Sequence, residues 1–382
     1  MLTPQSLAAT LFKVDVYLSI ARGNAPILAA EELTFQVPSS FSLWNSDGLQ
    51  TWEERLGKQP VFRMERTYYE MINSTTNFTE MIKSHLLWED IQLCLSSTQA
   101  KLWRLHAVAR NAANEPDADS TACKEILKKQ FNHLKIQIDQ MALCPGLPPH
   151  YYGFEDHLSP DSRPIIEARS ETLRFDTIFI YHLLNIHLYS DISGIQQMAR
   201  EFSLDLSKFS EQQQHTIGGR RCEKAAIIST PEFRRALCHA VDILSEFQLL
   251  DTKPPCFKVG LDPVAYVALS TAVLIFWVHI TFGLYSCEDC EASLGYQFSE
   301  QTLELGPSDQ SPCLREEWVE TGLMLKVAIN GMKICACNIM GLIGQFKAFL
   351  PDGEGWELAE SIAPGVFGTQ AVIKNPRVEV AV

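Results

Sequence analysis

"PVAYVALSTAVLIFWVHITFGLYS", residues 263–286, is the stretch that decides what kind of fold this chain can adopt. It carries no formal charge, and a helix of this length and composition could cross a bilayer. It also contains Ser270, Thr271, His279 and Thr281, and no basic cluster flanks either end to set an orientation. A buried helix at the centre of a large helical domain has the same composition. We therefore expect a core helix, with a membrane span at 263–286 as the alternative.

Helical patterns extend outward from this stretch in both directions. Thr230-Pro231-Glu232 is a helix start, with a capping hydroxyl, a proline at the first helical position and an acid in the first turn. Apolar residues at helical spacing follow this start, and they recur nearer the N-terminus. The residues expected to face the core are Leu7, Leu11, Val14 and Leu18, then Cys123, Leu127, Phe131, Leu134, Ile138 and Met141, then Phe233, Leu237, Val241, Leu244 and Phe247.

Strand patterns are nearly absent from the sequence. Long helices are expected over 79–110 and roughly 314–349, and we recognise no sustained alternation and no Asn-Gly hairpin between alternating runs. The sequence therefore predicts an all-α fold, one large irregular multi-helix domain over 1–382. The proline-rich stretch at 145–162 is the candidate seam.

Composition limits the functions that this chain can have. Of its 382 residues, 46% are apolar and 20% are charged, which is typical of a folded globular protein. The formal net charge is −14, and a surface this acidic repels nucleic-acid phosphates. The 11 cysteines are odd in number and scattered, and the N-terminus shows no signal-peptide pattern. We expect reduced thiols in an intracellular protein that does not grip DNA tightly by itself.

Motifs for catalysis are missing from the sequence. It contains no phosphate-binding loop, no G-x-S-x-G nucleophile elbow and no H-E-x-x-H zinc motif. We therefore expect a protein that is not an enzyme and that carries no cofactor. A helical enzyme with an unrecognised site is the less favoured alternative.

Cysteine spacing gives one weak metal candidate. Cys287 and Cys290 have the spacing of half a zinc site, with Cys313, Cys335 or Cys337 as partners. A second closely spaced pair at finger-like distance is missing. We therefore interpret these cysteines as small buried residues and expect no metal.

Histidines and basic residues give two further candidates. His182 and His187 lie five positions apart on an apolar helix and are expected to be satisfied core residues. The densest basic cluster is a candidate contact patch or nuclear-import signal, although a solvated face is the favoured interpretation. Its members are Arg220, Arg221 and Lys224, followed by Arg234 and Arg235.

The N-terminal region contains a proline-broken stretch without helical periodicity, "FQVPSSFSLWNSDG", at 35–48. Gly23 can end the preceding helix with a positive φ, and Pro26 prevents that helix from restarting. We expect the chain then to cross the helices in extended form, anchored by burial of Trp44 and Trp52.

This region, residues 11–56, resembles the regulatory middle homology region of fungal transcription factors, whose DNA-binding part is a zinc cluster or classical zinc fingers. The segments that carry the resemblance are Ala21-Arg22-Gly23, Ala25-Pro26, Glu31-Glu32, Pro38, Leu43-Trp44 and Trp52-Glu53. Over the other residues the likeness is limited to long helices of similar character.

The resemblance implies a nuclear, non-catalytic regulatory domain that restrains or licenses transcription. Its partners would be other transcription factors or co-regulators. A small-molecule effector would bind in an apolar cavity among 173–188, 263–286 and 318–346. We find no zinc-binding DNA-reading module, so DNA would be reached only indirectly or through a missing N-terminal module. The chain is expected to be a fragment or a regulator without its own reader, and no membrane association is expected.

Overall fold

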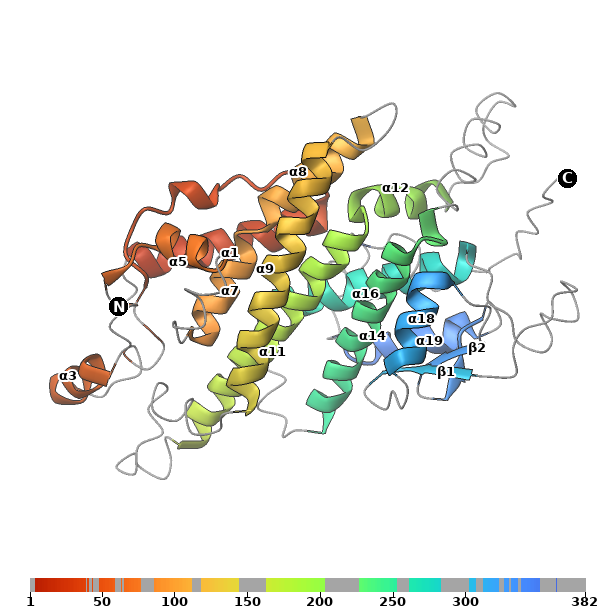
Figure 1. Ribbon diagram of the computed structural model, residues 1–382. Coiled ribbons are helices and arrows are strands. Elements are labelled where there is room, and N and C mark those ends of the chain that lie inside the picture. Colours follow the sequence, from red (N-terminus) through yellow and green to blue (C-terminus); the bar gives the residue numbers. More distant parts are fainter. Residues whose placement is uncertain are drawn as a thin grey trace, which may run out of the picture.

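The computed structural model shows a helical protein with one small sheet (Figure 1). Of the described residues, 79% are helical, and the predicted all-α class is confirmed. The structure describes residues 4–38, 40, 43, 48–58, 63, 65–76, 86–111, 118–143, 163–202, 227–252, 261–282, 302–306, 312–322, 326–329, 331–335, 338–350 and 362.

The elements follow one another in a simple order along the chain. The helices are α1 (Pro4–Arg22), the 3-10 helix η1 (Ala30–Glu32), α3 (Leu49–Lys58), α5 (Tyr68–Ser74), α7 (Trp88–Ser96), α8 (Gln99–Asn111), α9 (Ala118–Leu143), α11 (Arg163–Tyr189), α12 (Ile192–Phe202), α14 (Pro231–Asp251), α16 (Pro263–Phe282), α18 (Pro312–Thr321) and α19 (Ile339–Lys347). The strands are β1 (Thr302–Leu305), β2 (Lys326–Ile329) and β3 (Met332–Lys333).

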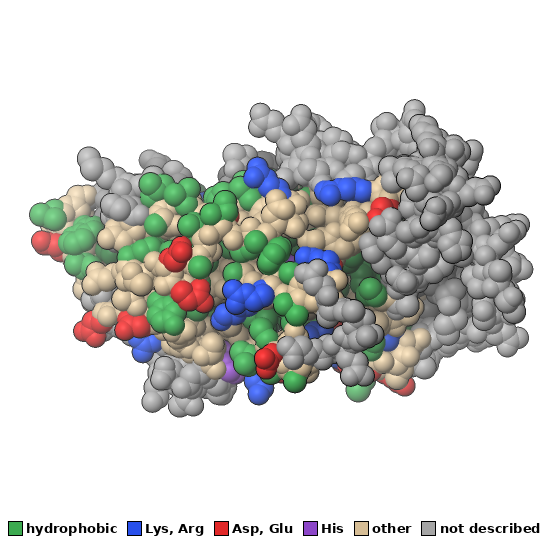
Figure 2. Space-filling view, turned by 90° about the horizontal axis from the view of Figure 1, so that it is seen from above, with side chains coloured by type: hydrophobic (Ala, Val, Ile, Leu, Met, Phe, Trp, Pro, Cys, Tyr) green, Lys and Arg blue, Asp and Glu red, His purple; other side chains and the backbone are tan. Residues whose placement is uncertain are grey.

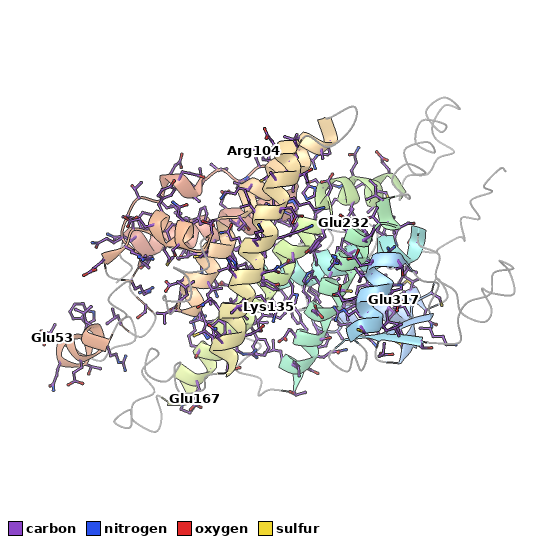
Figure 3. All side chains as sticks on the ribbon, viewed as in Figure 1. Glu53, Arg104, Lys135, Glu167, Glu232 and Glu317 are labelled. Carbon is purple, nitrogen blue, oxygen red and sulfur yellow. The ribbon has the colours of Figure 1, made fainter. Side chains whose placement is uncertain are left out.

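Helix α11 is the centre of the fold. It packs against α7, α9, α14 and α16, and α14 also packs against α16 and α18. Side chains fill the space between these helices, whereas the labelled Glu53, Arg104, Glu167 and Glu317 are exposed (Figure 3). Thr230 caps α14 as the sequence predicts, accepting a hydrogen bond from the Phe233 backbone N–H.

Helix α16 is the one helix within the described ranges that is long and apolar enough to cross a membrane. In the structure 89% of its apolar window, Pro263–Thr281, is buried inside the protein. Its neighbours are α1, α11, α12, α14 and α19, all from the same chain. A core helix requires such burial. The structure therefore agrees with the core-helix interpretation that the sequence favours.

Helix α1 buries a different face from the one predicted. Leu7 and Leu11 are about half exposed, at 48% and 54%. The buried face instead contains Ala9, Phe12, Val16 and Ile20. Both faces of α1 are apolar, so periodicity alone does not select the buried one. The buried face is the one whose Phe12 ring meets the Tyr68 ring edge to face.

The chain crosses from α1 to α5 in a segment that we call the strap, residues 23–38. Gly23 ends α1 with φ +67°, as predicted, and the Gly23 carbonyl accepts a hydrogen bond from the Ser193 hydroxyl of α12. Further along, the Tyr68 N–H donates to the Phe35 carbonyl at 2.9 Å, and the two rings stack. The expected N-terminal crossover is therefore present over residues 23–38, where the 3-10 helix η1 interrupts it, and it is held by backbone pairing and by Tyr68. Most of residues 39–47 lie outside the described part of the chain.

The expected tryptophan anchors do not hold the strap. Trp52 is 38% exposed on α3, so its predicted burial is wrong, and Trp44 lies outside the described residues. Tyr68 is fully buried, and its hydroxyl donates to the Leu93 carbonyl of α7. A tyrosine downstream of the strap thus takes the anchoring role predicted for Trp52.

A buried ion pair joins Arg63 to Asp90 of α7 at the same end of the molecule. The Arg63 guanidinium makes three hydrogen bonds of 2.9–3.1 Å to the Asp90 carboxylate, and both side chains are buried. Asp90 also accepts a hydrogen bond from the Leu87 backbone N–H at the start of α7. This geometry satisfies both charges, which a buried pair needs to be stable.

Two helix predictions are wrong in extent. The described part of 79–110 is divided into α7 and α8, because Ser96, Ser97 and Thr98 donate their hydroxyls back to α7 carbonyls, which competes with continued helix. The helix expected over 314–349 is also divided, into α18 and α19, with two strands between them.

The small sheet forms where no strands are recognised in the sequence, since strand patterns are nearly absent from it. Strands β2 and β3 pair antiparallel, with Ile329 opposite Met332 and Gly331 at φ +74°. The sequence between the paired residues is Asn330-Gly331, a dipeptide that is a strong hairpin signal. Strand β1 pairs in parallel with β2, and α18 lies between them in the chain.

The candidate seam at 145–162 falls outside the described residues. Helices on its two sides, α9 and α11, pack against each other. One hydrophobic cluster joins buried residues from α1 through α19.

Candidate functional site

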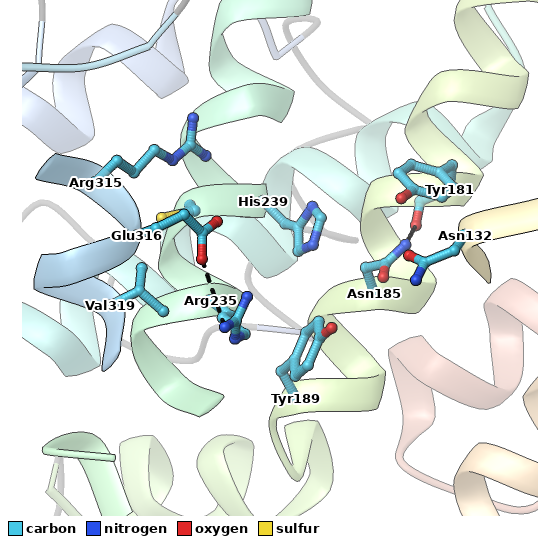
Figure 4. A pocket seen from close by; sticks show the side chains of 10 residues that line it. Asn132, Tyr181, Asn185, Tyr189, Arg235, His239, Arg315, Glu316 and Val319 are labelled. Atoms are coloured by element: carbon cyan, nitrogen blue, oxygen red, sulfur yellow. Dashed lines mark hydrogen bonds and ion pairs between the residues drawn. The ribbon is translucent and has the colours of Figure 1, made fainter. Parts of the chain in front are cut away.

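A pocket of about 450 Å³ lies between α9, α11, α14 and α18 (Figure 4). Helix α11 contributes Tyr181, Asn185 and Tyr189 at intervals of four residues, which places them on one face. The other lining residues come from α9, α14 and α18. They are Asn132, Arg235, Cys238, His239, Arg315, Glu316 and Val319.

The wall formed by α18 is held in place by Arg234 of α14. This buried guanidinium donates to the Val319 and Ser229 carbonyls, and it lies against Gly322, the residue after α18. Gly322 has φ +68°, and a Cβ there would come within 2.9 Å of an Arg234 nitrogen. Arg234 therefore fixes the end of the helix that closes the pocket.

Charges within the pocket are balanced. Arg235 pairs with Glu320 and lies 3.6 Å from Glu316, and Arg315 lies 3.5 Å from a carboxylate oxygen of Asp242. The sequence predicts Arg234 and Arg235 on a solvated basic face, and this prediction is wrong for both. Arg235 lies half-buried at the pocket in contact with acids, and Arg234 is a buried structural residue.

A cluster of two histidines and one carboxylate lies beside the pocket. His182 Nδ1 of α11 is 3.0 Å from His239 Nδ1 of α14. Asp242 Oδ2 lies 3.7 Å from the first of these nitrogens and 3.9 Å from the second. The ligand atoms of these three residues all lie within 4.8 Å of one another, close enough to hold one metal ion. No other such group of three or more is found within the described part of the chain.

Aromatic rings surround the cluster and fix its orientation. The Tyr189 ring stacks on His239 with centroids 6.0 Å apart, and the Tyr181 ring meets both histidines edge to face. Burial lowers the pKa of His182 to about 3 and that of His239 to about 3. Both imidazoles are therefore neutral near pH 7 and can use a nitrogen lone pair.

The thiol and the buried phenol of the pocket are protonated near pH 7. Burial raises the pKa of the Cys238 thiol to about 11 and raises the pKa of the Tyr181 hydroxyl above its usual value. A thiol in this state is a weak nucleophile. Near pH 7 the Cys238 thiol and the Tyr181 hydroxyl therefore act as hydrogen-bonding groups of the pocket wall.

A second histidine pair lies on the same helix. His187 of α11 stacks on His106 of α8, with ring centroids 5.2 Å apart. His187 Nδ1 pairs with the Gln99 amide oxygen at 2.8 Å, and His106 Nε2 pairs with the His187 carbonyl. The predicted role of His187 as a satisfied core histidine fits these contacts, whereas His182 faces a carboxylate and a second ring nitrogen.

The other predicted site residues are not gathered at this pocket. Cys287, Cys290 and Cys337 lie outside the described residues, as do Arg220, Arg221 and Lys224. Cys313 is exposed on α18 and Cys335 is buried, and neither belongs to the histidine–carboxylate cluster. Pro26 belongs to the strap, where the next two backbone N–H groups donate to Asp15.

The pocket differs in place and in character from the predicted ligand cavity. An apolar cavity among 173–188, 263–286 and 318–346 is expected from the sequence, but the pocket has polar walls and α16 contributes no lining residue to it. The sequence-based prediction does not include the places of Arg235 and His239 in the pocket wall or of Asp242 in the adjacent cluster, although their i, i+4, i+7 spacing puts them on one face of α14. The missing information is the pairing of that face with Tyr181 and His182 of α11.

Comparisons with protein-family models, with curated proteins and with solved structures found no match for this chain. The functional argument therefore depends on its own residues.

Proposed function

We propose that this chain is a non-catalytic regulatory domain of the fungal transcription factor type, acting in the nucleus through protein partners. The observation that carries the proposal is the strap. Its order of helix, Gly23, Pro26 and extended crossing is the order on which the family resemblance is based. Both ends of the strap are tied to other helices, so it is an integral part of the domain.

The strap is supported by α12 and α5. Gln196 donates to the Ile20 and Ala21 carbonyls at the end of α1, and Ser193 donates to Gly23. At the other end the strap forms an antiparallel bridge between Gln36 and Thr67. A ligand or partner that shifts α12 would therefore also shift the strap. In this way a change in the interior could alter the surface of the domain.

Partner binding is supported by the exposed apolar residues of α1 and by the acidity of the chain. Leu7 and Leu11 of α1 are about half exposed to solvent. On the face seen from above, hydrophobic side chains lie among both acidic and basic ones (Figure 2). Such a mixed surface suits protein contacts, and a net charge of −14 disfavours direct contact with DNA.

Effector binding is supported by the pocket beneath α18. Its volume of about 450 Å³ is within the range of small-molecule sites. Asn132, Asn185 and the two tyrosines offer hydrogen bonds and aromatic faces, and each of the two arginines of the pocket has an acidic partner. We propose a small polar effector in this pocket, in place of the apolar cavity that the sequence suggests for a small-molecule effector.

Two alternatives have less support. A membrane protein spanning at α16 would have to expose a helix whose window is 89% buried among other helices of the chain. A helical enzyme that uses Cys238 as its nucleophile would need a thiolate, and burial raises the pKa of that thiol, which keeps it protonated near pH 7.

The test combines fractionation with a tethered reporter in a filamentous fungus. The tagged chain is expected in the salt-extractable nuclear fraction, and retention in alkali-washed membranes would overturn the proposal in favour of the membrane alternative. Fused to an unrelated DNA-binding domain, the chain should change reporter output several-fold relative to that domain alone.

Two variants make the reporter specific. Gly23→Val forces a branched side chain into a positive φ and against Ser193, so it should abolish the reporter effect. Gly57→Val, at an exposed α3 position where an added Cβ meets nothing within 4 Å, is the matched control and should retain the effect. Equal reporter output with and without the fused wild-type chain would contradict the regulatory role.

A further inference from the structure

We propose that His182, His239 and Asp242 form a binding site for a divalent transition-metal ion, with zinc as the best fit. The expectation of no metal from the sequence depends on cysteine spacing and does not consider this cluster. The proposal goes beyond the regulatory function and does not depend on it. It rests on the positions of three ligand atoms from two helices.

The ligand atoms are already at coordination distance from a common point. The three atoms form a triangle with sides of 3.0, 3.7 and 3.9 Å. The point equidistant from the corners of such a triangle lies about 2.1 Å from each, which matches zinc–nitrogen and zinc–oxygen bonds. An ion could therefore bind with little movement of α11 or α14.

The chemistry of the ligands agrees with this geometry. Zinc binds neutral imidazole nitrogens and carboxylate oxygens. Two neutral imidazoles whose Nδ1 atoms face each other at 3.0 Å can share only one proton between those atoms. When that proton moves to Nε2 of its own ring, both imidazoles stay neutral and both Nδ1 lone pairs become free to bind an ion. Asp242 would supply a negative charge.

Neighbouring groups hold the ligands in this arrangement. Arg315 lies near Oδ1 of Asp242, which leaves Oδ2 directed at the histidines. Partners of this kind orient the ligands of metal sites. The stacked Tyr189 ring and the edge of Tyr181 restrict rotation of His239.

The surrounding charges do not exclude a cation. Lys135, Arg235 and Arg315 are the positive groups that act on the two histidines. Arg315 is opposed by Asp242, and Arg235 by two glutamates of α18.

Access and the ligand count indicate an open site. His239 lines the pocket, and the Asp242 side chain is 28% exposed, so an ion can enter from solvent. Three protein ligands leave the fourth zinc position free, as in sites that bind water or a small molecule. The fourth ligand would be water, or a carboxylate or hydroxyl oxygen of a molecule bound in the pocket.

The test uses the full chain, freed of metal by a chelator and then titrated with zinc chloride against a chromophoric competitor. We expect one zinc ion per chain at this site. Cobalt chloride should give the intense visible absorption of a four-coordinate ion. His239→Gln and the nearly isosteric Asp242→Asn should each weaken zinc binding by about tenfold or more. His133→Gln, a part-buried histidine on α9, is the matched control and should bind like the wild type.

Thermal unfolding followed by circular dichroism separates loss of ligation from loss of fold. Zinc should raise the melting temperature of the wild type and of His133→Gln, but not that of a folded Asp242→Asn. The proposal is overturned if the wild type binds no zinc stoichiometrically. It is also overturned if folded Asp242→Asn and folded His239→Gln both bind zinc as tightly as the wild type, because the ion would then be held elsewhere, for example by cysteines.

Discussion

The two histidine pairs of α11 contain the same side chains at the same ring separation, yet they have different surroundings. In both pairs the ring centroids are 5.2 Å apart. The His106–His187 pair is completed by an amide oxygen and a backbone carbonyl, so its contacts are those of a structural core. The His182–His239 pair faces Asp242, and its ring nitrogens converge with the carboxylate. The partner atoms, and not the histidines themselves, decide which pair can bind an ion.

The largest expected effect is on zinc binding. His182→Asn should weaken it by about tenfold or more, because a metal ligand is lost from an otherwise formed site. His106→Gln should leave zinc affinity within about twofold, since that pair offers no carboxylate. Competition titration of the two folded variants measures the difference. Equal losses in both would mean that the pairs are equivalent.

The next effect is on stability without metal. Gln99→Leu removes the buried amide that contacts both His187 and Ser19, and should cost about 1–3 kcal/mol of unfolding free energy. Asp242→Asn should cost under about 1 kcal/mol, because its carboxyl group is partly exposed and its ion pair with Arg315 is weak. Urea unfolding of the metal-free proteins checks the order, and the reverse order would refute the structural role of the His106–His187 pair.

Lowering the pH should reduce the free energy of unfolding through buried neutral histidines outside the metal cluster. Burial lowers the pKa of His279 to about 3 and lowers that of His187 well below its usual value. The unfolded chain, with a histidine pKa near 6.5, binds more protons below that pH. Stability from each histidine is therefore complete above about pH 6.5 and falls by about 1.4 kcal/mol per pH unit below it.

His279→Gln and His187→Gln should each flatten this loss, measured as the difference from wild type in urea unfolding at pH 7 and pH 5. Asp176 acts in the opposite direction, because burial raises its pKa to about 7 and its contribution falls as pH rises. It is present in all of the proteins and cancels in the difference. Slopes identical to wild type would contradict the buried, neutral state of these histidines.

The smallest effect is expected at the ring that stacks on His239. Tyr189→Leu should cost about 0.5–1.5 kcal/mol of stability and lower zinc affinity several-fold, because His239 gains rotational freedom. Tyr69→Leu, at an exposed tyrosine of α5, should change stability by under about 0.5 kcal/mol. Zinc titration and thermal unfolding of both variants measure the contrast, and an unchanged affinity in Tyr189→Leu would remove the proposed orienting role.

Local patterns predict the parts of this fold that depend on neighbours in sequence. The start of α14 at Thr230, the end of α1 at Gly23 and the buried face of α9 follow from capping, backbone freedom and periodicity. The hairpin of β2 and β3 is also readable from Asn330-Gly331, a signal that the prediction of an all-helical chain does not use. The face of α1 is not readable, because its two faces are both apolar and the choice depends on contacts with other helices, α7 among them.

Local sequence patterns do not predict most of the candidate site. Its ligands come from α11 and α14, and His182 and His239 are 57 positions apart. Nothing in the sequence near either histidine marks the other as its partner. Periodicity places Asp242 on the face of His239, but only tertiary packing brings that face to His182.

The link between Gly23 and Ser193 also has a consequence for the nascent chain. The two residues are 170 positions apart, and Gln196 reaches Ile20 over 176. At a synthesis rate of about 5–20 residues per second, on the order of ten seconds or more pass between the synthesis of α1 and that of α12, whose side chains bind the end of α1. During that interval its buried face, with Phe12 and Val16, depends on nearer helices or on chaperones for cover. The N-terminal segment is thus synthesised early, but its contacts with α12 form late.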